Sequence, residues 1–504
     1  MSEAKKYLLG LDAGNTVIKA VLFDLDGNQV AMHALDGQSV SPQPGHVERD
    51  LDELWANAGV VIKQCIKQAR IRADEISAVG CAGHGNGLYL VDKKGTPVVG
   101  IQSLDTRAAE LAGSLNEAAG ERFHELCLQK PWPSQTPTLL AWIKHNRPEL
   151  YERTGTVLLC KDFITYRLTG EFVSEISDMS GCGLVRMPGC NYDDELLALY
   201  DLADAKELLP RIANPCDVVG TVTSTAAELT GLAAGTPVIA GFFDVVSSAL
   251  GAGTGRAGEA SIIAGTWSIN QVFSSKPVID PSVFMVSAFD ADRFVNIEAS
   301  ATSAANLEWY VRELVERGTH REDAFDYCNE KISGVEPRID DPLFHPFLYG
   351  SAKGAEYRAG FYGLAGWHGE SHLLRALFEG VVFEHRRHVG VLKAAGVTFD
   401  RAGLSGGGSR SPHWPQMFAD CLGVPIAVAE ARETGALGAA IGAAIAISHV
   451  GSYEEGLQRM TRVQDEFEPN LQLNAHYDAR YETYLSLCDA MSTFWSNQQQ
   501  ESQK

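Results

Sequence analysis

Asp244 is the residue of this sequence best placed to act as a general base. An apolar run at 237–240 predicts a buried strand before it, and small and apolar residues after it predict a helix. Substrates of α/β proteins are usually held at strand ends, so this carboxylate would lie where chemistry is done. The alternative is that Asp244 only caps the helix, because helix starts favour Asp.

Asp12 is a second carboxylate at the end of a predicted strand. Residues 7–23 predict two strands joined by a polar turn that contains Gly14, Asn15 and Thr16. Small residues let backbone N–H groups approach a phosphate, and the Asn15 and Thr16 side chains can donate further hydrogen bonds. Asp12 is then a candidate ligand for hydrated Mg²⁺, which keeps several waters and takes few protein ligands. A plain β-hairpin turn is the alternative.

The same pattern returns in the second half of the chain. Residues 260–273 predict two strands around Gly265 and Thr266, which gives a weak internal repeat with a phosphate-sized turn in each half. A glycine-rich turn follows another predicted strand at 404–405, and glycines there would let a flat base or a ribose lie against the backbone. The candidate residues of this turn are Gly407, Gly408 and Ser409.

Other loops carry side chains that suit a small polar ligand. His84 stands among glycines beyond a predicted strand, and Trp132 places an aromatic ring on a further loop. Asp105 and Arg107 are two residues apart, so both can face one pocket. A turn histidine without a ligand, and a structural salt bridge between Asp105 and Arg107, are the alternatives.

Composition excludes several classes of partner. The chain has 504 residues and a net charge of −22, which disfavours binding to nucleic acid or to an anionic membrane. Its ten cysteines are scattered without Cys-x-x-Cys pairs, so free thiols are expected and a zinc site is not. We find neither a signal-peptide pattern nor an apolar run of membrane-spanning length, and we expect a cytoplasmic protein.

The length of the chain and a glycine-rich run suggest two domains. A chain of this length is too long for a single core. The run at 251–258 is expected to be a loose linker, which gives domains at 1–252 and 253–504. Two similar lobes with Asp244 between them would form a cleft.

These motifs, in this order and spacing, make the chain resemble the FGGY family of carbohydrate kinases. The resemblance covers about residues 7–490. It rests on Asp12, Gly14, Thr16 and Lys19, on Gly241 and Asp244, on Gly265, Thr266 and Trp267, and on Gly406 to Ser409 with Trp414, Gln416 and Asp420. It implies an α/β fold of two actin-like (ribonuclease H-like) domains with a central cleft. The first domain would bind the sugar and the second the nucleotide.

The resemblance also implies a reaction and a role for each candidate residue. MgATP would donate its γ-phosphoryl group to a sugar hydroxyl, Asp244 would accept the hydroxyl proton, and Asp12 would hold Mg²⁺ through water. The implied nucleotide-binding residues are Gly14, Asn15, Thr16, Gly265, Thr266, Gly407, Gly408 and Ser409. The implied sugar-binding residues are Asp105, His84, Arg107, Trp132 and Asp244.

Within the family, several stretches resemble bacterial L-xylulose kinases. Among them are residues 41–50, 243–247 and 346–351. This implies a ketopentose substrate such as L-xylulose, phosphorylated at its terminal hydroxyl. The alternatives are a polyol kinase for glycerol or erythritol, and an actin-like ATPase without a small-molecule substrate. The oligomeric state stays open between a monomer and a homodimer.

Overall fold

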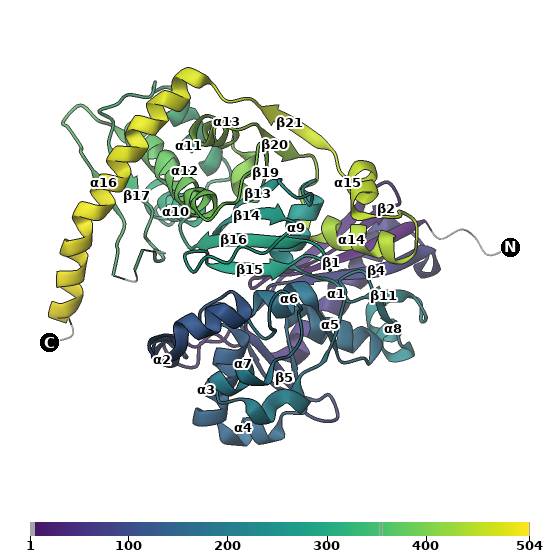
Figure 1. The fold of residues 1–504 in the computed structure, drawn as a ribbon. Coiled ribbons are helices and arrows are strands. Elements are labelled where there is room, and N and C mark those ends of the chain that lie inside the picture. The colour runs from purple at the N-terminus through teal and green to yellow at the C-terminus, as the bar shows by residue number, and fades with distance from the viewer. Residues whose placement is uncertain (1–5, 352, 355, 503–504) are drawn as a thin grey trace. The chain divides into compact units, whose positions relative to one another are not determined.

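The chain folds into two compact α/β units (Figure 1). The computed structural model describes residues 6–351, 353–354 and 356–502. Unit 1 comprises Met1–Ala257, Phe273–Asn296 and Glu433–Arg462, and unit 2 comprises Gly258–Val272, Ile297–Arg432 and Val463–Lys504. Each unit is thus built from segments distant in sequence, whereas the predicted division ran once between residues 252 and 253. In the described part of the chain, no helix has the length and apolar character needed to cross a membrane.

Unit 1 is organised by a large mixed sheet. Its strand order is β10-β11-β4-β1-β2-β3, and β12 also pairs with β4. These strands are β1 (Tyr7–Ala13), β2 (Val17–Asp24), β3 (Gln29–Asp36), β4 (Ile76–Gly83), β10 (Val218–Thr221), β11 (Pro237–Ile239) and β12 (Phe242–Phe243). β1 pairs antiparallel with β2 and parallel with β4. Every residue of β4 is buried, as expected for a central strand covered on both faces.

Smaller sheets and helices complete unit 1. The sheets consist of β5 (Leu88–Val91), β6 (Pro97–Ile101) and β7 (Thr156–Leu158), and of β8 (Val173–Glu175) and β9 (Arg211–Ala213). The helices are α1 (Leu51–Ala69), η1 (Ala73–Glu75), α2 (Ala109–Cys127), α3 (Thr136–Asn146), α4 (Pro148–Arg153), α5 (Cys160–Thr169), α6 (Ile176–Gly181), α7 (Asp194–Leu199), η2 (Ala203–Leu208), α8 (Ser224–Thr230), α9 (Asp244–Gly251), α14 (Thr434–Ala446) and α15 (Tyr453–Met460). The ten cysteines are free thiols, as predicted.

The other large sheet has the order β15-β16-β14-β13-β19-β20-β21. Its strands are β13 (Ala260–Ala264), β14 (Ser268–Ser274), β15 (Met285–Ala288), β16 (Phe294–Ser300), β19 (Ala402–Ser405), β20 (Ile426–Ala429) and β21 (Val463–Phe467). The hairpin of β17 (Leu343–His345) and β18 (Gly360–Tyr362) stands apart from it. The helices of unit 2 are α10 (Ala305–Tyr310), the π-helix η3 (Val311–Glu316), α11 (Ala324–Ser333), α12 (Glu370–Ala394), η4 (Gly407–Arg410), α13 (Trp414–Leu422) and α16 (Leu471–Ser502).

The internal repeat predicted from the sequence is present as a shared strand arrangement. In unit 1 the hairpin of β1 and β2 is followed by β4, which pairs parallel with β1. In unit 2 the hairpin of β13 and β14 is followed by β19, which pairs parallel with β13. Thr16 and Thr266, one in the turn of each hairpin, are both exposed.

Helix α14 packs backbone to backbone against β1, β4 and α9 (Figure 1). A β-carbon added at Gly10 of β1 or at Gly80 of β4 would overlap a carbonyl oxygen of α14. One added at Gly438 of α14 would overlap the carbonyl oxygen of Ser247 in α9. The close approach therefore depends on glycines on both sides of the contact.

The glycine-rich run at 251–258 is not the loose linker that we expected. Gly251 is the last residue of α9, and a β-carbon there would overlap the carbonyl oxygen of Thr434 in α14. The Gly255 carbonyl accepts a hydrogen bond of 3.1 Å from Arg293 Nη1. Glycines in this run thus permit close packing, and a glycine-rich sequence looks the same whether it is loose or tightly packed.

We predict that Gly438→Ala destabilises the protein although alanine is the better helix former. Alanine favours a helix over glycine by up to about 1 kcal/mol, but overpacking of a tight contact costs about 1–3 kcal/mol. Gly390→Ala in α12 is the matched control, because Gly390 is exposed and has open space around its α-carbon. Chemical denaturation should show a lower free energy of unfolding for Gly438→Ala only; equal stability of the two variants would contradict the packing argument.

Candidate functional site

Asp12 and Asp244 lie at the same end of strands that flank β4. In the parallel pairing of β1 with β4, Asp12 is opposite Ala82. In the parallel pairing of β12 with β4, Phe243 is opposite Gly83, and Asp244 follows as the first residue of α9. The two carboxylates are therefore brought to one edge of the sheet from positions more than two hundred residues apart in the sequence.

Asp244 does not act as the helix cap that was the alternative interpretation. The N-cap residue of α9 is Phe243, and the cap makes no side-chain hydrogen bond. Asp12 and Asp244 are half-buried as whole residues, and their carboxyl groups lie among many protein atoms. Burial raises the pKa of Asp12 to about 6. Burial, followed by the negative charge of Asp12, raises the pKa of Asp244 to about 8.

An ion pair and a glycine complete the surroundings of Asp12. Lys19 is opposite Asp12 in the hairpin, and its Nζ lies 2.7 Å from Glu433 Oε2. A β-carbon added at Gly435, in the first turn of α14, would lie 2.5 Å from Asp12 Oδ2. Because Gly435 carries no side chain, the start of the helix can lie directly over the carboxylate.

The donor set at this edge fits a hydrated Mg²⁺. Two carboxylates with raised pKa values gain from a nearby cation, because it favours their ionised forms. Among the described residues, no three His, Cys, Asp or Glu side chains converge as a ready metal cage. Mg²⁺ does not need one, since it is usually bound through one or two carboxylates, several waters and substrate phosphates.

The first polar turn leaves its threonine accessible and braces its asparagine. The Asn15 Nδ2 atom donates to Ser103 Oγ at 2.9 Å, so this side chain has a partner within the protein. The Gly14 carbonyl accepts from Arg49 Nη1 at 3.1 Å. Thr16 is exposed, and its carbonyl accepts from Gly37 N at 2.7 Å. The backbone of the turn is thus fixed while Thr16 stays exposed.

In unit 2, the structure brings the remaining nucleotide candidates together. A β-carbon added at Gly406 would lie 3.1 Å from Gly265 N, so the turn after β19 lies against the turn of the β13–β14 hairpin. Gly408 is buried against Ala264, whereas Gly407 is exposed with open space at its α-carbon. The Ser409 hydroxyl donates to the Gly406 carbonyl at 2.8 Å and holds this turn.

His84 has internal partners at both ring nitrogens. Its Nε2 lies 2.8 Å from the Tyr89 hydroxyl, and its Nδ1 lies 3.3 Å from the Gly85 carbonyl oxygen. Burial lowers the pKa of His84 to about 4, so the ring is neutral at physiological pH. Any contact of His84 with a sugar would therefore add to bonds that already fix the ring.

Asp105 and Arg107 form the structural salt bridge that the sequence left open. Arg107 Nη2 lies 2.8 Å from Asp105 Oδ2 and 2.8 Å from Glu48 Oε1. Asp105 Oδ2 also accepts from Val47 N at 2.6 Å. Both side chains of the pair are almost fully buried, at 0% and 1% exposed. The pair fastens the segment around residue 48, and a role of Asp105 or Arg107 in sugar binding stays a prediction.

Two polar atoms on neighbouring loops are without a hydrogen-bond partner in the described structure. They are the Trp132 indole N–H and the Asn86 side-chain oxygen, both shielded from solvent. The loops are joined by a hydrogen bond of 2.9 Å from Gly87 N to the Ser134 carbonyl. Buried polar atoms normally find partners, so these two are available to a ligand with hydroxyl groups.

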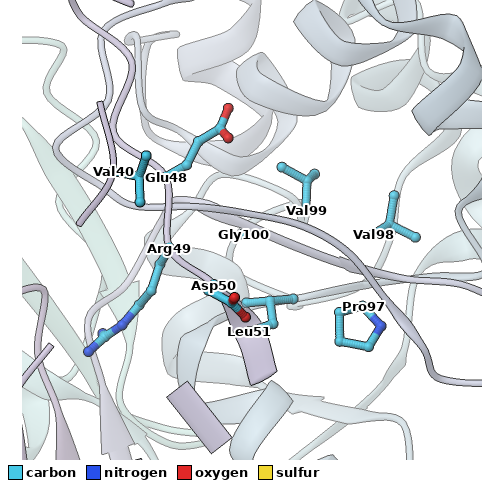
Figure 2. Close-up of a pocket in the computed structure, with 9 residues that line it drawn as sticks. All are labelled: Val40, Glu48, Arg49, Asp50, Leu51, Pro97, Val98, Val99 and Gly100. Carbon is cyan, nitrogen blue, oxygen red and sulfur yellow. The ribbon is translucent and has the colours of Figure 1, made fainter. Parts of the chain in front are cut away.

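A cavity of about 320 Å³ lies in unit 1 next to residues that contact Arg107 and Gly14 (Figure 2). It is lined by Val40, Glu48, Arg49, Asp50, Leu51, Pro97, Val98, Val99 and Gly100. In Figure 2 the Arg49 and Glu48 side chains extend in different directions. None of the predicted site residues lines this cavity, so we assign it no role in the reaction.

A buried network of His385, His388 and Asn270 lies next to the Gly265–Thr266 turn. His385 Nδ1 lies 2.8 Å from Asn270 Oδ1, and His388 Nδ1 lies 3.0 Å from Asn270 Nδ2. With this amide orientation His385 carries its proton on Nδ1, whereas His388 carries its proton on Nε2, 3.1 Å from Ser300 Oγ. His385 Nε2 then accepts from Ser303 Oγ at 3.0 Å.

This network flanks the Gly265–Thr266 turn on both sides. Ser268 is the first residue of β14 after the turn, and its Oγ lies 3.1 Å from His388 Nδ1. Ala304, next to Ser303, donates its N–H to the Gly265 carbonyl at 2.8 Å. Sequence reasoning missed this network because the histidines lie more than a hundred residues from the turn and look like ordinary positions of an amphipathic helix.

Sequence reasoning also missed what surrounds Asp12. The small residues at 435–440 suit close packing, but their sequence does not say against which element they pack. Glu433 carried no signal of its own, since its partner Lys19 is 414 residues away.

Comparisons with known proteins agree with these motifs. Residues 7–251 match the model of the N-terminal domain of the FGGY family of carbohydrate kinases, and residues 260–447 match that of its C-terminal domain. A probable L-xylulose kinase of Pasteurella multocida (strain Pm70) is 35% identical over 491 residues, which cover 96% of this chain and 99% of that protein. An L-xylulose/3-keto-L-gulonate kinase of Escherichia coli (strain K12) is 33% identical, covering 97% and 98%. The crystal structure of a xylulose kinase from Rhodospirillum rubrum matches with a TM-score of 0.86 at 26% identity, covering 97% and 100%.

We predict that the histidine network makes the protein less stable in mild acid. Burial holds the pKa of His385 and of His388 well below the usual value, so the folded state stays unprotonated. The unfolded state takes up protons below about pH 6.5, so stability is fully present above that pH and falls below it. Each histidine should contribute about 1.4 kcal/mol per pH unit to this slope.

The check is the free energy of unfolding of His388→Gln between pH 7 and pH 5. The variant should be less stable than the wild type at pH 7 but lose less stability on acidification. The same substitution at His320, an exposed residue, controls for the removal of one imidazole. An unchanged slope in His388→Gln would show that the ring is not kept neutral by the fold.

Proposed function

Because this chain belongs to the FGGY family of carbohydrate kinases, we propose that it transfers the γ-phosphoryl group of MgATP to the terminal hydroxyl of a ketopentose, with L-xylulose first. The chain is a sugar kinase with the mixed α/β fold of that family. The donor, the position of transfer, the sugar and a cytoplasmic location are our proposals. The observation that carries the catalytic proposal is the placement of Asp12 and Asp244 at one edge of the unit 1 sheet.

The proposed chemistry assigns Asp244 as the base. When bound, MgATP supplies the phosphoryl group, and Mg²⁺ offsets the charge of the phosphate oxygens. Asp244 accepts the proton of the sugar hydroxyl as the hydroxyl oxygen attacks the phosphoryl group. The raised pKa of Asp244, about 8, supports this role, because a general base works best with a pKa near the operating pH. The cation charge that Asp12 would hold through water favours the ionised form of Asp244.

The proposed ligand contacts use exposed residues, open backbone and polar atoms that have no hydrogen-bond partner among the described residues. Thr16 and Thr266 are exposed residues, and their hydroxyls would donate to phosphate oxygens. The open backbone at Gly407, with Gly408 and Ser409, would border the adenosine. The Trp132 indole N–H and the Asn86 oxygen would pair with sugar hydroxyls.

The proposed sugar rests on the relatives and on the polarity of the loops. The two relatives described above are both named for L-xylulose, and one of them also for 3-keto-L-gulonate. A site built to hydrogen-bond several hydroxyls rejects analogues that lack them, which disfavours a three-carbon triol. A glycerol or erythritol kinase is the second candidate function.

We predict that Asp244→Asn loses about 10²- to 10⁴-fold in turnover, because asparagine has a similar shape but cannot take up a proton. Its melting temperature should not fall, since the cap of α9 does not use this side chain and asparagine removes a buried acid whose ionisation the fold disfavours. Asp194→Asn is the control: it removes a carboxylate from the first residue of another helix in the same unit. Near-normal turnover of Asp244→Asn would remove Asp244 from the mechanism.

The substrate prediction is tested by comparing kcat/KM across a panel. L-xylulose should exceed D-xylulose, both ribuloses, 3-keto-L-gulonate, erythritol and glycerol, with ADP release as the signal and the product identified by NMR. If 3-keto-L-gulonate or a ribulose leads, the kinase assignment holds and the named sugar is wrong. If glycerol or erythritol exceeds every ketopentose, the second candidate function replaces the first.

A further inference from the structure

A buried cluster of charged side chains lies behind Asp244 in unit 1, outside the candidate site. Lys161, in α5, places its Nζ 2.6 Å from Asp162 Oδ1, 3.1 Å from Asp178 Oδ2 and 3.3 Å from Glu175 Oε1. All four side chains are 0% exposed. One cation among three carboxylates is costly to bury, so the cluster calls for an explanation beyond stability.

The cluster is linked to Asp244 through one hydroxyl group. Glu175 caps α6 and accepts from Ser177 N at 2.6 Å and from Ser177 Oγ at 2.9 Å. Ser177 Oγ in turn accepts from Phe243 N at 3.1 Å. Because the single hydroxyl proton points to Glu175, a lone pair of the oxygen is free to receive the Phe243 N–H. The chain of bonds thus ends on the residue directly before Asp244.

The packing around Phe243 leaves it little freedom. A β-carbon added at Gly85 would lie 2.5 Å from the Phe243 ring, and one added at Gly181 would lie 3.2 Å from it. Gly241, two residues earlier, has a φ of +90° and lies against the Cys81 carbonyl oxygen. The backbone that enters α9 is therefore confined by β4, by the loop after β4 and by α6.

The charges of the cluster are consistent with a fixed support. Burial raises the pKa of Asp178 well above its usual value, and the pKa of Glu175 is raised as well, with burial again the main cause. The positive charge of Lys161 acts against this rise at both carboxyl groups. Glu175 also accepts three hydrogen bonds from α6, which favour its ionised form.

We propose that Ser177, held by Glu175 and Lys161, is a positioning residue for Asp244. The Ser177 hydroxyl fixes the Phe243 peptide and so the direction in which α9 presents its first carboxylate. The inference rests on the proposed role of Asp244 as base. Alignment of the Asp244 carboxylate, and not substrate affinity, then depends on the buried Ser177 hydroxyl.

The test compares Ser177→Ala with Ser180→Ala. The two serines lie in the same short helix, both are buried, and each hydroxyl accepts one backbone N–H: Ser177 from Phe243 and Ser180 from Ala288. Ser177→Ala should lower kcat at least tenfold with the KM for the sugar within threefold. Ser180→Ala should keep kcat within twofold, whatever its effect on the melting temperature.

A second readout separates positioning from general loosening. Hydrogen exchange, followed by mass spectrometry on a peptide that covers 241–248, should speed up in Ser177→Ala and not in Ser180→Ala. If Ser177→Ala does not fold, Ser177→Cys keeps the side-chain size with a weaker acceptor and takes its place. An unchanged kcat, or equal losses in the two serine variants, would overturn the inference.

Asp244→Asn is measured alongside, so that the two proposals can fail separately. If Asp244→Asn keeps its turnover, the role of Asp244 as base is wrong, and a loss in Ser177→Ala has another cause. If Asp244→Asn is inactive while Ser177→Ala keeps its kcat, only the positioning inference is wrong.

Discussion

The contact of α14 with β1, β4 and α9 is the constraint on which the candidate site depends. Glycines on both sides let backbones meet without side chains between them, so the helix lies where a β-carbon at Gly10, Gly80 or Gly438 would overlap a carbonyl oxygen. That approach brings Gly435 over the Asp12 carboxylate and Glu433 to Lys19. The packing of α14 therefore determines the electrostatic surroundings of Asp12, because a side chain at any of these glycines would move the helix.

The close packing explains why the pKa values of the two carboxyl groups are raised. Burial raises the pKa of Asp12, and the negative charge of Glu433 adds to the rise; burial raises the pKa of Asp244, and the negative charge of Asp12 adds to it. Such an arrangement is unfavourable for the protein alone and becomes favourable beside a cation. Lys19 offsets part of the charge near Asp12, but its pairing with Glu433 limits how much of its charge is available. These charges support our proposal that the site takes up a ligand that brings positive charge.

Each unit has a buried polar network next to a candidate ligand-binding segment. In unit 1 the Lys161 cluster reaches the start of α9 through Ser177, and in unit 2 Asn270 joins His385 and His388 behind the Gly265 turn. Loss of one member leaves another buried polar atom unpaired, which costs more than the net worth of the bond itself. Such networks therefore hold a loop in one geometry, where apolar packing alone would tolerate small displacements.

The sequence by itself determined the local motifs and through them the family. Asp12, Asp244 and the two Gly-Thr turns could be found because strand, turn and helix signals lie within a few residues of one another. Only the tertiary structure decided what surrounds them. In the structure Asp105 and Arg107 form a salt bridge, and glycines of the run at 251–258 pack tightly. The segment Glu433–Arg462 belongs to unit 1, far from the rest of that unit in the sequence. A glycine or a buried charge takes its meaning from the atom opposite it, and here that atom is often hundreds of residues away.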